Sequence, residues 1–398
     1  MIFVDINTFF APKSGGIRVY HEAKLAWFAA HPEHRYFLVC PGPRYGERWL
    51  AENVVIVEVA GARCGRDPAG YRLMLDFARV LRLLRRVRPD VVEVGDPWMS
   101  GPFCLLLRSL GLLPGRLVSF YHCDAVPTWI TPWASAPGRL QRLRAPAGRL
   151  ATAIFYRTQR AYPLTAVAST TMQRRLVEQG IENVVRLPFG TDEAFFAAAE
   201  LRRERREGGN VRLLYVGRLG REKGADLLLA ALPRLLALPG VQLTVVGRGT
   251  YAADFAAIHR RGFAYRDFVA DRADMAQIYG THDVLLAPGA HETFGLSVLE
   301  ALAAGLIVVG PDAGATADLL ATLAPRFRFR AGCVDDFCRA ANAAVCADLP
   351  AEAARSTTLA RTYGSWSAAI ERMVRYHEAA TPAATAPAGR RPDRHVAA

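Results

Sequence analysis

The sequence contains very little lysine. Its 398 residues carry a formal net charge of +13, yet only Lys13, Lys24 and Lys223 are lysines, against 47 arginines. So strong a bias is typical of the composition of a whole genome, and a single arginine therefore indicates little. A retained lysine is more informative, because a guanidinium cannot replace its compact charge at every site. Lys13 and Lys223 both lie in glycine-rich stretches.

Long apolar runs, a basic leader and paired cysteines are also lacking. The longest apolar runs are far shorter than the ~20 residues that a membrane-spanning helix needs. No basic leader precedes a hydrophobic run at the N-terminus. The seven cysteines show neither CxxC nor Cys/His zinc spacing, which indicates free thiols in a reducing compartment. We therefore expect a cytoplasmic protein.

Strand-like and helical patterns alternate along the chain, which predicts parallel sheets with crossover helices. A length of 398 residues favours two domains. In the first series we expect strands at 1–10, 36–42, 54–60, 90–96, 116–122 and 164–170, with helices at 17–30, 71–87 and 171–180. In the second series we expect strands at 211–217, 241–247, 263–270, 282–289 and 306–310, with helices at 224–238 and 295–304.

A charged segment separates the two series. We expect a first domain over 1–188, a linker over 189–210 and a second domain from 211. The Pro- and Ala-rich tail, 380–398, is typical of disorder. Ligands of open α/β sheets bind at the carboxyl ends of the strands, so we expect the site in the cleft between the domains.

The stretch "LLYVGRLGREKG" puts Arg218 and Lys223 among glycines at the end of a strand. Glycines allow a ligand to approach closely, and two cations could clamp a diphosphate. The GK[ST] ending of a Walker loop is absent. An ordinary strand-to-helix turn with solvated charges explains the stretch equally well.

In "GAHETFGLSVLEALAAG", Glu292 and Glu300 are eight residues apart, with no Lys or Arg among them. The first N–H groups of the predicted helix, those of Phe294, Gly295 and Leu296, lack backbone partners and favour an anion. Carboxylates on either side of a phosphate suit ligands with hydroxyl groups, as in a nucleotide sugar. Alternatively, Glu292 caps the helix and Glu300 pairs with a distant arginine.

These motifs, in this order, resemble the retaining glycosyltransferases of family 4. The resemblance covers nearly the whole chain and includes "PKSGGIRVY", "FYHCD", "GRLGREKG", "VVGRGT" and "WSAAIERMVRYHE". It implies the GT-B fold, with two doubly wound Rossmann-like domains facing across a cleft. It also implies that the second domain ends near 360 and that a helix over 361–379 crosses back to the first domain.

The resemblance also implies site residues. Glu292 would hold the transferred sugar, and Arg218 and Lys223 the diphosphate, with His122 near the sugar. The further donor-binding positions would be Gly15, Gly16, Arg248, Val269, Phe294, Gly295, Leu296 and Glu300, the last at the ribose. Asp124 is a candidate for orienting His122 or the acceptor. Retention would follow a front-face route that needs no metal or other cofactor, and no convincing DxD motif is present.

The sequence departs from the family pattern at two places. Asp318 in "AGATAD" stands where many members have Glu, and Gly289 stands where a serine is usual. "PGAHETFGL" and "FYHCD" look most like bacterial mannosyltransferases that act on lipids. We therefore expect a hexose, with mannose from GDP-mannose favoured, to be transferred to a lipid or glycan hydroxyl.

The surplus arginines are interleaved with Leu, Phe and Tyr in two stretches of the first domain, 72–89 and 136–162. This pattern fits a surface that sits on an anionic membrane, and a solvated face in an Arg-biased proteome fits it equally. The membrane would be the inner face of the plasma membrane. No recognised nucleic-acid module accompanies the charge, so we expect no nucleic-acid partner.

Other functions also remain open. A UDP-hexose could be the donor, or the chain could be a non-catalytic subunit that binds a nucleotide sugar. The two-glutamate stretch argues against a nucleotide-sugar epimerase of this fold. A phosphorylase is disfavoured because no pyridoxal-lysine signature is recognisable.

Overall fold

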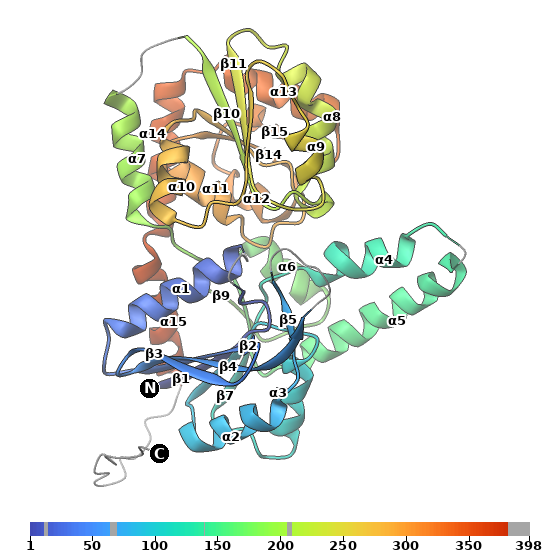
Figure 1. Ribbon diagram of the computed structural model, residues 1–398, viewed down its shortest axis with the longest axis vertical. Coiled ribbons are helices and arrows are strands. Elements are labelled where there is room, and N and C mark those ends of the chain that lie inside the picture. Colours follow the sequence, from blue (N-terminus) through green and yellow to red (C-terminus); the bar gives the residue numbers. More distant parts are fainter. Residues whose placement is uncertain (12–14, 64–69, 139, 205–208, 381–398) are drawn as a thin grey trace.

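Two α/β domains stand one above the other in the computed structural model of this chain (Figure 1). The structure describes residues 1–11, 15–63, 70–138, 140–204 and 209–380. Lys13 lies outside the described residues. So does the tail from 381 onward, which is nearly all of the segment 380–398 that we expected to be disordered.

The first domain is built on a mostly parallel sheet. Its described strands are β1 (Ile2–Ile6), β2 (Arg35–Gly42), β3 (Gly46–Ala51), β4 (Val54–Arg63), β5 (Arg72–Met74), β6 (Val91–Val94), β7 (Arg116–Phe120), β8 (Thr165–Val167) and β9 (Val184–Arg186). They pair in the order β3-β4-β2-β1-β6-β7-β8-β9, with β5 on β4. β3 and β5 run antiparallel to β4. The helices are α1 (Gly16–Ala29), α2 (Phe77–Val87), α3 (Ser100–Ser109), η1 (Val126–Ile130), α4 (Thr131–Ser135), α5 (Gln141–Arg160) and α6 (Thr170–Glu178).

One predicted helix of this domain was too long. We expected a helix over 71–87, but α2 begins at Phe77, and Arg72–Met74 form the edge strand β5. The carboxylate of Asp76 fixes the start of α2 by accepting a hydrogen bond from the backbone N–H of Arg79 at 3.1 Å.

The second domain has a parallel sheet of six described strands in the order β12-β11-β10-β13-β14-β15. They are β10 (Val211–Val216), β11 (Val241–Val246), β12 (Phe263–Arg266), β13 (Val284–Leu286), β14 (Ile307–Pro311) and β15 (Arg328–Phe329). The helical segments are α7 (Glu193–Glu204), η2 (Arg221–Lys223), α8 (Ala225–Leu235), α9 (Ala252–Ala256), α10 (Arg272–Gly280), α11 (Leu296–Ala303), α12 (Gly314–Leu319), η3 (Pro325–Phe327), α13 (Val334–Val345), α14 (Leu349–Tyr363) and α15 (Trp366–Ala379). β10 lies between β11 and β13, so its carboxyl end faces the middle of the cleft.

The segment 189–210, expected to be a linker, is helical over more than half of its length. Helix α7 occupies Glu193–Glu204 and packs against α10, α11 and α14 of the second domain. Its buried phenylalanines explain the difference, because Phe195 and Phe196 belong to the core. The charged residues that suggested a linker come only after this apolar stretch.

The chain returns to the first domain through α15. This helix packs against α1, and the ring of Phe3 lies 6.1 Å from that of His377. Where the two domains meet, the ring of Phe189 lies 5.0 Å from that of Phe294 and 5.3 Å from that of Trp366. The crossover helix therefore adds to an aromatic contact beneath the cleft.

Candidate functional site

A cavity of about 890 Å³ lies between the two domains and is lined by residues of both. The carboxyl ends of β1 and β7 approach it from the first domain, and those of β10, β11 and β13 from the second. It is lined by every residue that we predicted as catalytic or donor-binding: Gly15, Gly16, His122, Arg218, Lys223, Arg248, Val269, Glu292, Phe294, Gly295, Leu296 and Glu300. Asp124 and Asp318 are not among the lining residues.

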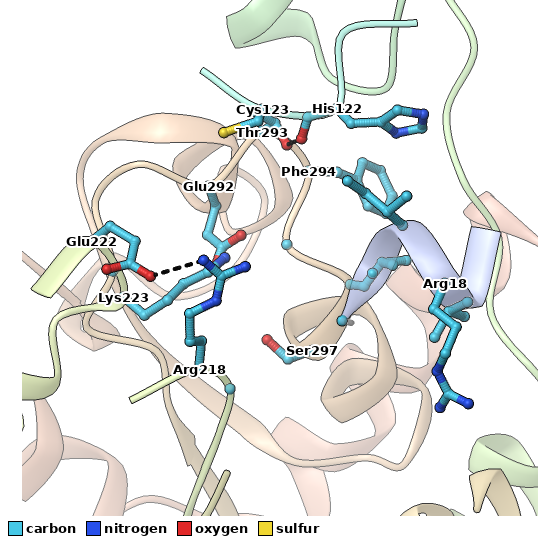
Figure 2. Close-up of a pocket in the computed structure, with 18 of the residues that line it drawn as sticks. Arg18, His122, Cys123, Arg218, Glu222, Lys223, Glu292, Thr293, Phe294 and Ser297 are labelled. Atoms are coloured by element: carbon cyan, nitrogen blue, oxygen red, sulfur yellow. Dashed lines mark hydrogen bonds and ion pairs between the residues drawn. The ribbon is translucent and has the colours of Figure 1, made fainter. Parts of the chain in front are cut away.

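At one side of the cavity, two cations lie beside carboxylates. Lys223 Nζ is 2.7 Å from Glu292 Oε1, and Arg218 Nη1 is 3.5 Å from Glu222 Oε1. Figure 2 shows the side chains of Arg218, Lys223 and Glu292 converging on the same space. Glu292 therefore pairs with Lys223, a partner that the sequence did not reveal. It does not cap helix α11, whose N-cap residue is Gly295.

The loop after β10, which carries Lys223, and the loop after β13, which carries Glu292, pack closely at glycines. A Cβ at Gly289 would lie 3.1 Å from Lys223 Cα, and one at Gly224 would lie 2.8 Å from the carbonyl of Pro288. Gly224 also has a φ of 71°, in the left-handed region that favours glycine. The glycine that stands where the family usually has a serine thus leaves room for the backbone of Lys223 beside residue 289.

Two helix starts face each other across the cleft. Gly295, with a φ of 88°, precedes α11, and Gly15 precedes α1. A Cβ at Gly16 would lie 2.9 Å from Leu296 Cδ1, which shows how closely the two starts approach. Helix N-termini carry unpaired N–H groups and partial positive charge. Together with Arg218 and Lys223 they make this part of the cavity suitable for an anion.

Glu300 has the arginine partner that our alternative interpretation proposed. Its Oε1 lies 2.7 Å from Arg272 Nη2, and its Oε2 accepts a hydrogen bond from the Tyr279 hydroxyl at 3.1 Å. Burial raises the pKa of Glu300, and the charge of Arg272 opposes that rise. Arg272 also pairs with Asp192 at 2.6 Å. Glu300 still lines the cavity, so its carboxylate is held in place at the cavity wall.

His122 is kept neutral. Burial lowers the pKa of its imidazole well below the usual range, and the nearby His21 and Lys24 lower it further. The ring stacks on Phe120 at 4.5 Å, and its Nε2 is buried with no hydrogen-bond partner among the described residues. The backbone at His122 also joins the domains, because the Thr293 hydroxyl donates to its carbonyl at 2.8 Å. His122 thus lines the cavity with a neutral ring whose buried Nε2 keeps the capacity for one more hydrogen bond.

Asp124 and Asp318, the two candidate residues that do not line the cavity, have partners elsewhere in the protein. Asp124 pairs with Arg175 and accepts a hydrogen bond from the Tyr121 hydroxyl at 3.0 Å. These groups bind the buried carboxylate, and the expected role of Asp124 in orienting His122 or the acceptor stays a prediction.

Asp318 connects the two domains. Its Oδ2 accepts a hydrogen bond from the backbone N–H of Thr171 at 2.6 Å, and its Oδ1 accepts one from the Thr171 hydroxyl at 2.8 Å. Thr171 lies in the first turn of α6, in the first domain. The geometry therefore gives Asp318 a role in holding the domains together.

The remaining edge of the cavity contains Arg248 and Val269. The Arg248 guanidinium donates from Nε to Asp267 Oδ1 at 2.8 Å, and its Nη2 pairs with Asp267 Oδ2. Arg18 of α1 reaches across the cleft and donates to the carbonyl of Ala270 at 3.0 Å. This edge is therefore formed by both domains.

Among the residues that sequence reasoning missed at the site are Arg18, Arg272 and Thr293. Arg18 and Arg272 were concealed by the abundance of arginine. Arg18 follows the Gly15–Gly16 pair by two residues, and Thr293 follows Glu292 directly. These positions within recognised motifs were the available signals for Arg18 and Thr293, and the alternative that Glu300 pairs with a distant arginine was the signal for Arg272.

Solved structures with similar folds are glycosyltransferases of the GT-B type. Sucrose-phosphate synthase from Thermosynechococcus elongatus has a TM-score of 0.73 at 16% identity, and the match covers 96% of this chain and all of the other. Anabaena Alr3699/HepE, solved in complex with UDP, has a TM-score of 0.67 at 15% identity, covering 95% of this chain and 100% of that one. These likenesses define the fold class as GT-B.

The sequence comparisons define the family. Residues 15–195 match Glycosyltransferase Family 4, and residues 210–345 match Glycosyl transferases group 1. A GDP-mannose-dependent alpha-(1-6)-phosphatidylinositol dimannoside mannosyltransferase from Mycobacterium tuberculosis is 31% identical over 337 residues, 80% of this chain and 82% of that protein. A GDP-mannose-dependent alpha-mannosyltransferase from Mycolicibacterium smegmatis is 30% identical, with 76% of each chain covered. The chain belongs to glycosyltransferase family 4 and is a hexosyltransferase.

Proposed function

We propose that this enzyme transfers mannose from GDP-mannose to a hydroxyl group of a lipid or glycan acceptor, with retention of anomeric configuration. The observation that carries the proposal is the contact of Lys223 with Glu292 in the wall of the cavity. It supports a cation for a diphosphate next to a carboxylate for sugar hydroxyls. Relatives that use GDP-mannose support the choice of donor.

In this proposal the diphosphate lies against Arg218, Lys223 and the N–H groups at the start of α11. Glu292 accepts hydrogen bonds from the sugar hydroxyls, and Glu300 accepts them from the ribose. His122 of the first domain, whose ring is neutral and whose Nε2 has no partner among the described residues, forms a hydrogen bond with a sugar hydroxyl. Gly15 and Gly16 let the first loop approach the phosphates, while Arg248 and Val269 line the nucleotide pocket.

The proposed reaction breaks the bond between the anomeric carbon and the β-phosphate oxygen. The electron pair stays on that oxygen, and the sugar passes through an oxocarbenium-like state. The acceptor oxygen then bonds to the anomeric carbon on the same face, and its proton moves to the departing phosphate oxygen. Arg218 and Lys223 stabilise the charge that develops there, which is usually the largest catalytic contribution. We propose that no metal or other cofactor takes part.

The acceptor side of the proposal involves a membrane. Within the described ranges, no helix is long and apolar enough to cross a bilayer. We propose that the enzyme works in the cytoplasm and associates peripherally with an anionic membrane that presents a lipid acceptor. No nucleic acid is proposed as a partner.

A thermal-shift comparison of GDP, UDP and ADP at matched concentrations tests the donor assignment. A ligand at 100 times its dissociation constant stabilises the folded protein by ~2.7 kcal/mol, enough to separate one nucleotide from the others. Selective stabilisation by GDP is the expected result. Selective stabilisation by UDP redirects the donor to a UDP-hexose. If none of the three stabilises the protein, the site assignment is wrong.

Two readouts distinguish an active enzyme from a non-catalytic subunit. Release of GDP from GDP-mannose, with or without a lipid extract as acceptor, is expected only from an enzyme. Binding of GDP without any release under these conditions favours the binding subunit.

A further inference from the structure

Helices α4 and α5 form a hairpin that projects from the first domain (Figure 1). We call residues 126–160, which contain η1 and this hairpin, the arm. The arm carries six arginines and neither aspartate nor glutamate. A surface of this composition has no internal counter-charge, so its positive charge must be balanced by solvent ions or by an anionic partner.

One face of α5 exposes an apolar stripe. Leu143, Leu150 and Ile154 are 68%, 62% and 54% exposed. Their spacing of seven and four residues places them on the same face of a helix with 3.6 residues per turn. The opposite face is used for packing, because Phe155 and Gln159 are buried. α5 thus presents a second apolar face that nothing in the described chain covers.

The arginines lie beside this stripe. Arg142 and Arg149, seven residues apart, follow one edge of it, and Arg144 follows the other. Within residues 140–204 and the other described ranges, none of these three forms an ion pair. Leucine flanked by arginine is the pattern of a helix that lies in a membrane interface, where apolar groups enter the acyl boundary and arginines reach phosphates.

The base of the arm is part of the cavity wall. Trp129, in η1, lines the cavity, and its ring lies 6.3 Å from that of Trp98. The Trp98 ring lies 5.6 Å from that of Phe155 in α5. At the same time α4 packs closely on α5, since a Cβ at Gly148 would lie 2.3 Å from Ala134 Cβ. The arm is therefore a packed extension of the cavity wall.

The other arginine-rich segment of this domain lacks such a face. In α2 the side chains of Val80, Leu83 and Leu84 are buried in the core of the first domain. Its arginines therefore cover a helix whose apolar side is already used. Among the two arginine-rich segments of the first domain, the described part of the arm therefore has the free apolar stripe beside its arginines.

We propose that the arm lies on an anionic lipid bilayer, with Leu143, Leu150 and Ile154 in the acyl boundary and Arg142, Arg144 and Arg149 on lipid phosphates. This inference rests on the proposed function, whose membrane partner it assigns to one surface. A lipid acceptor could then pass from the bilayer along the arm to Trp129 and the cavity. The charge complementarity selects the bilayer over a second copy of this chain, which is itself basic.

Flotation of the full chain with vesicles tests the inference. We compare phosphatidylcholine vesicles with vesicles that also contain phosphatidylglycerol. The wild type is expected to float with the anionic vesicles only. Leu143→Glu/Leu150→Glu and Arg142→Gln/Arg149→Gln are each expected to reduce the bound fraction by roughly tenfold or more, since a charge near an anionic surface changes the affinity by about fivefold. The matched control is Leu106→Glu/Leu110→Glu, in the last turn of α3 and directly after it, where both leucines are comparably exposed.

Three results would overturn the inference. They are equal flotation of the wild type with both kinds of vesicle, an equal loss in the α3 control, and full flotation of both arm variants. If gel filtration shows that Leu143→Glu/Leu150→Glu converts an oligomer to a monomer without changing flotation, a second copy covers the stripe. Stabilisation by GDP is measured on every variant. If the wild type does not float but is stabilised by GDP, only the proposal for the arm is contradicted. If GDP does not stabilise the wild type, the proposed function is contradicted.

Discussion

Lys223 Nζ lies 2.7 Å from Glu292 Oε1, at the point where the β10 and β13 loops meet. In the proposed function, a donor diphosphate attracts the ammonium group, and sugar hydroxyls then replace it at the carboxylate. The pair would thus hold two binding groups in place before the substrate arrives. Preorganised charges of this kind need little rearrangement when the reaction occurs.

The two partners are expected to respond differently to substitution. Lys223→Ala is expected to lower turnover by about 100- to 1000-fold and to weaken GDP binding, because it removes a phosphate contact. Glu292→Ala is expected to lower turnover without weakening GDP binding. Steady-state GDP release and GDP titration calorimetry measure the two effects.

Arg221→Ala is the matched control for this pair, because Arg221 lies in the same turn and its side chain is 85% exposed. It should leave both quantities unchanged. If GDP binding is lost in Glu292→Ala as well, the assignment of Glu292 to the sugar is wrong.

Asp318 and Thr171 are expected to act as a unit that links the domains. Each of Asp318→Ala and Thr171→Val removes part of a charge-assisted contact, which is typically worth about 1.5–3 kcal/mol. We expect each variant to lower the thermal midpoint and to increase cleavage by a protease under native conditions. The double variant should cost less than the sum of the two, with a coupling of at least ~0.5 kcal/mol. Strict additivity would contradict a direct contact.

His122 is expected to remain neutral at every pH at which the enzyme works. Because its pKa is lowered in the folded protein, its proton is released well below the usual range, and only acid should charge the ring. In NMR spectra of ¹³C-histidine-labelled protein, the signal that disappears in His122→Gln should not shift between pH 5.5 and 8. A shift centred near pH 6.5 would show that the ring is open to solvent.

Glu93 is expected to make stability depend on pH. Burial and the charge of Asp5 raise its pKa to about 7, while Lys24, 3.2 Å away, and the Tyr20 hydroxyl oppose the rise. The folded protein therefore holds a proton that the unfolded chain releases near pH 4.5. The stabilisation is complete below that pH and is lost as the pH rises through about 7.

Glu93→Gln removes this titration and keeps a side chain of similar size. The wild type should therefore lose a few degrees of thermal midpoint relative to Glu93→Gln between pH 5 and pH 8. Scanning calorimetry of both proteins at the two values measures the difference. A constant gap between the two midpoints would show that Glu93 is already ionised at pH 5.

The fold was largely predictable, because local patterns carried it. Alternating strands and helices indicated two parallel sheets, and β10, β11, β13 and β14 lie where the apolar runs predicted them. The edge strands β3 and β5 were not recognised, since short edge strands have weak patterns and depend on β4 as a partner. Helix α7 was obscured because its charged end dominated the composition of a short apolar segment.

The sequence by itself determined which side chains reach the cleft. Gly217, Gly224 and Gly295 have positive φ angles at turns after strands, and such turns put Arg218, Lys223 and Glu292 at one edge of a sheet. The physical reason is local, since a strand end, a glycine and a helix start together fix where the next side chain points.

Only the tertiary structure decided what those side chains bind. Lys223 meets Glu292 across 69 residues, and Thr171 meets Asp318 across 147. Arg272 pairs with Glu300, and Arg175 pairs with Asp124. A buried carboxylate takes whichever cation or donor the packing brings within reach. That choice depends on distances between remote segments, which hydrophobic periodicity and turn residues do not encode.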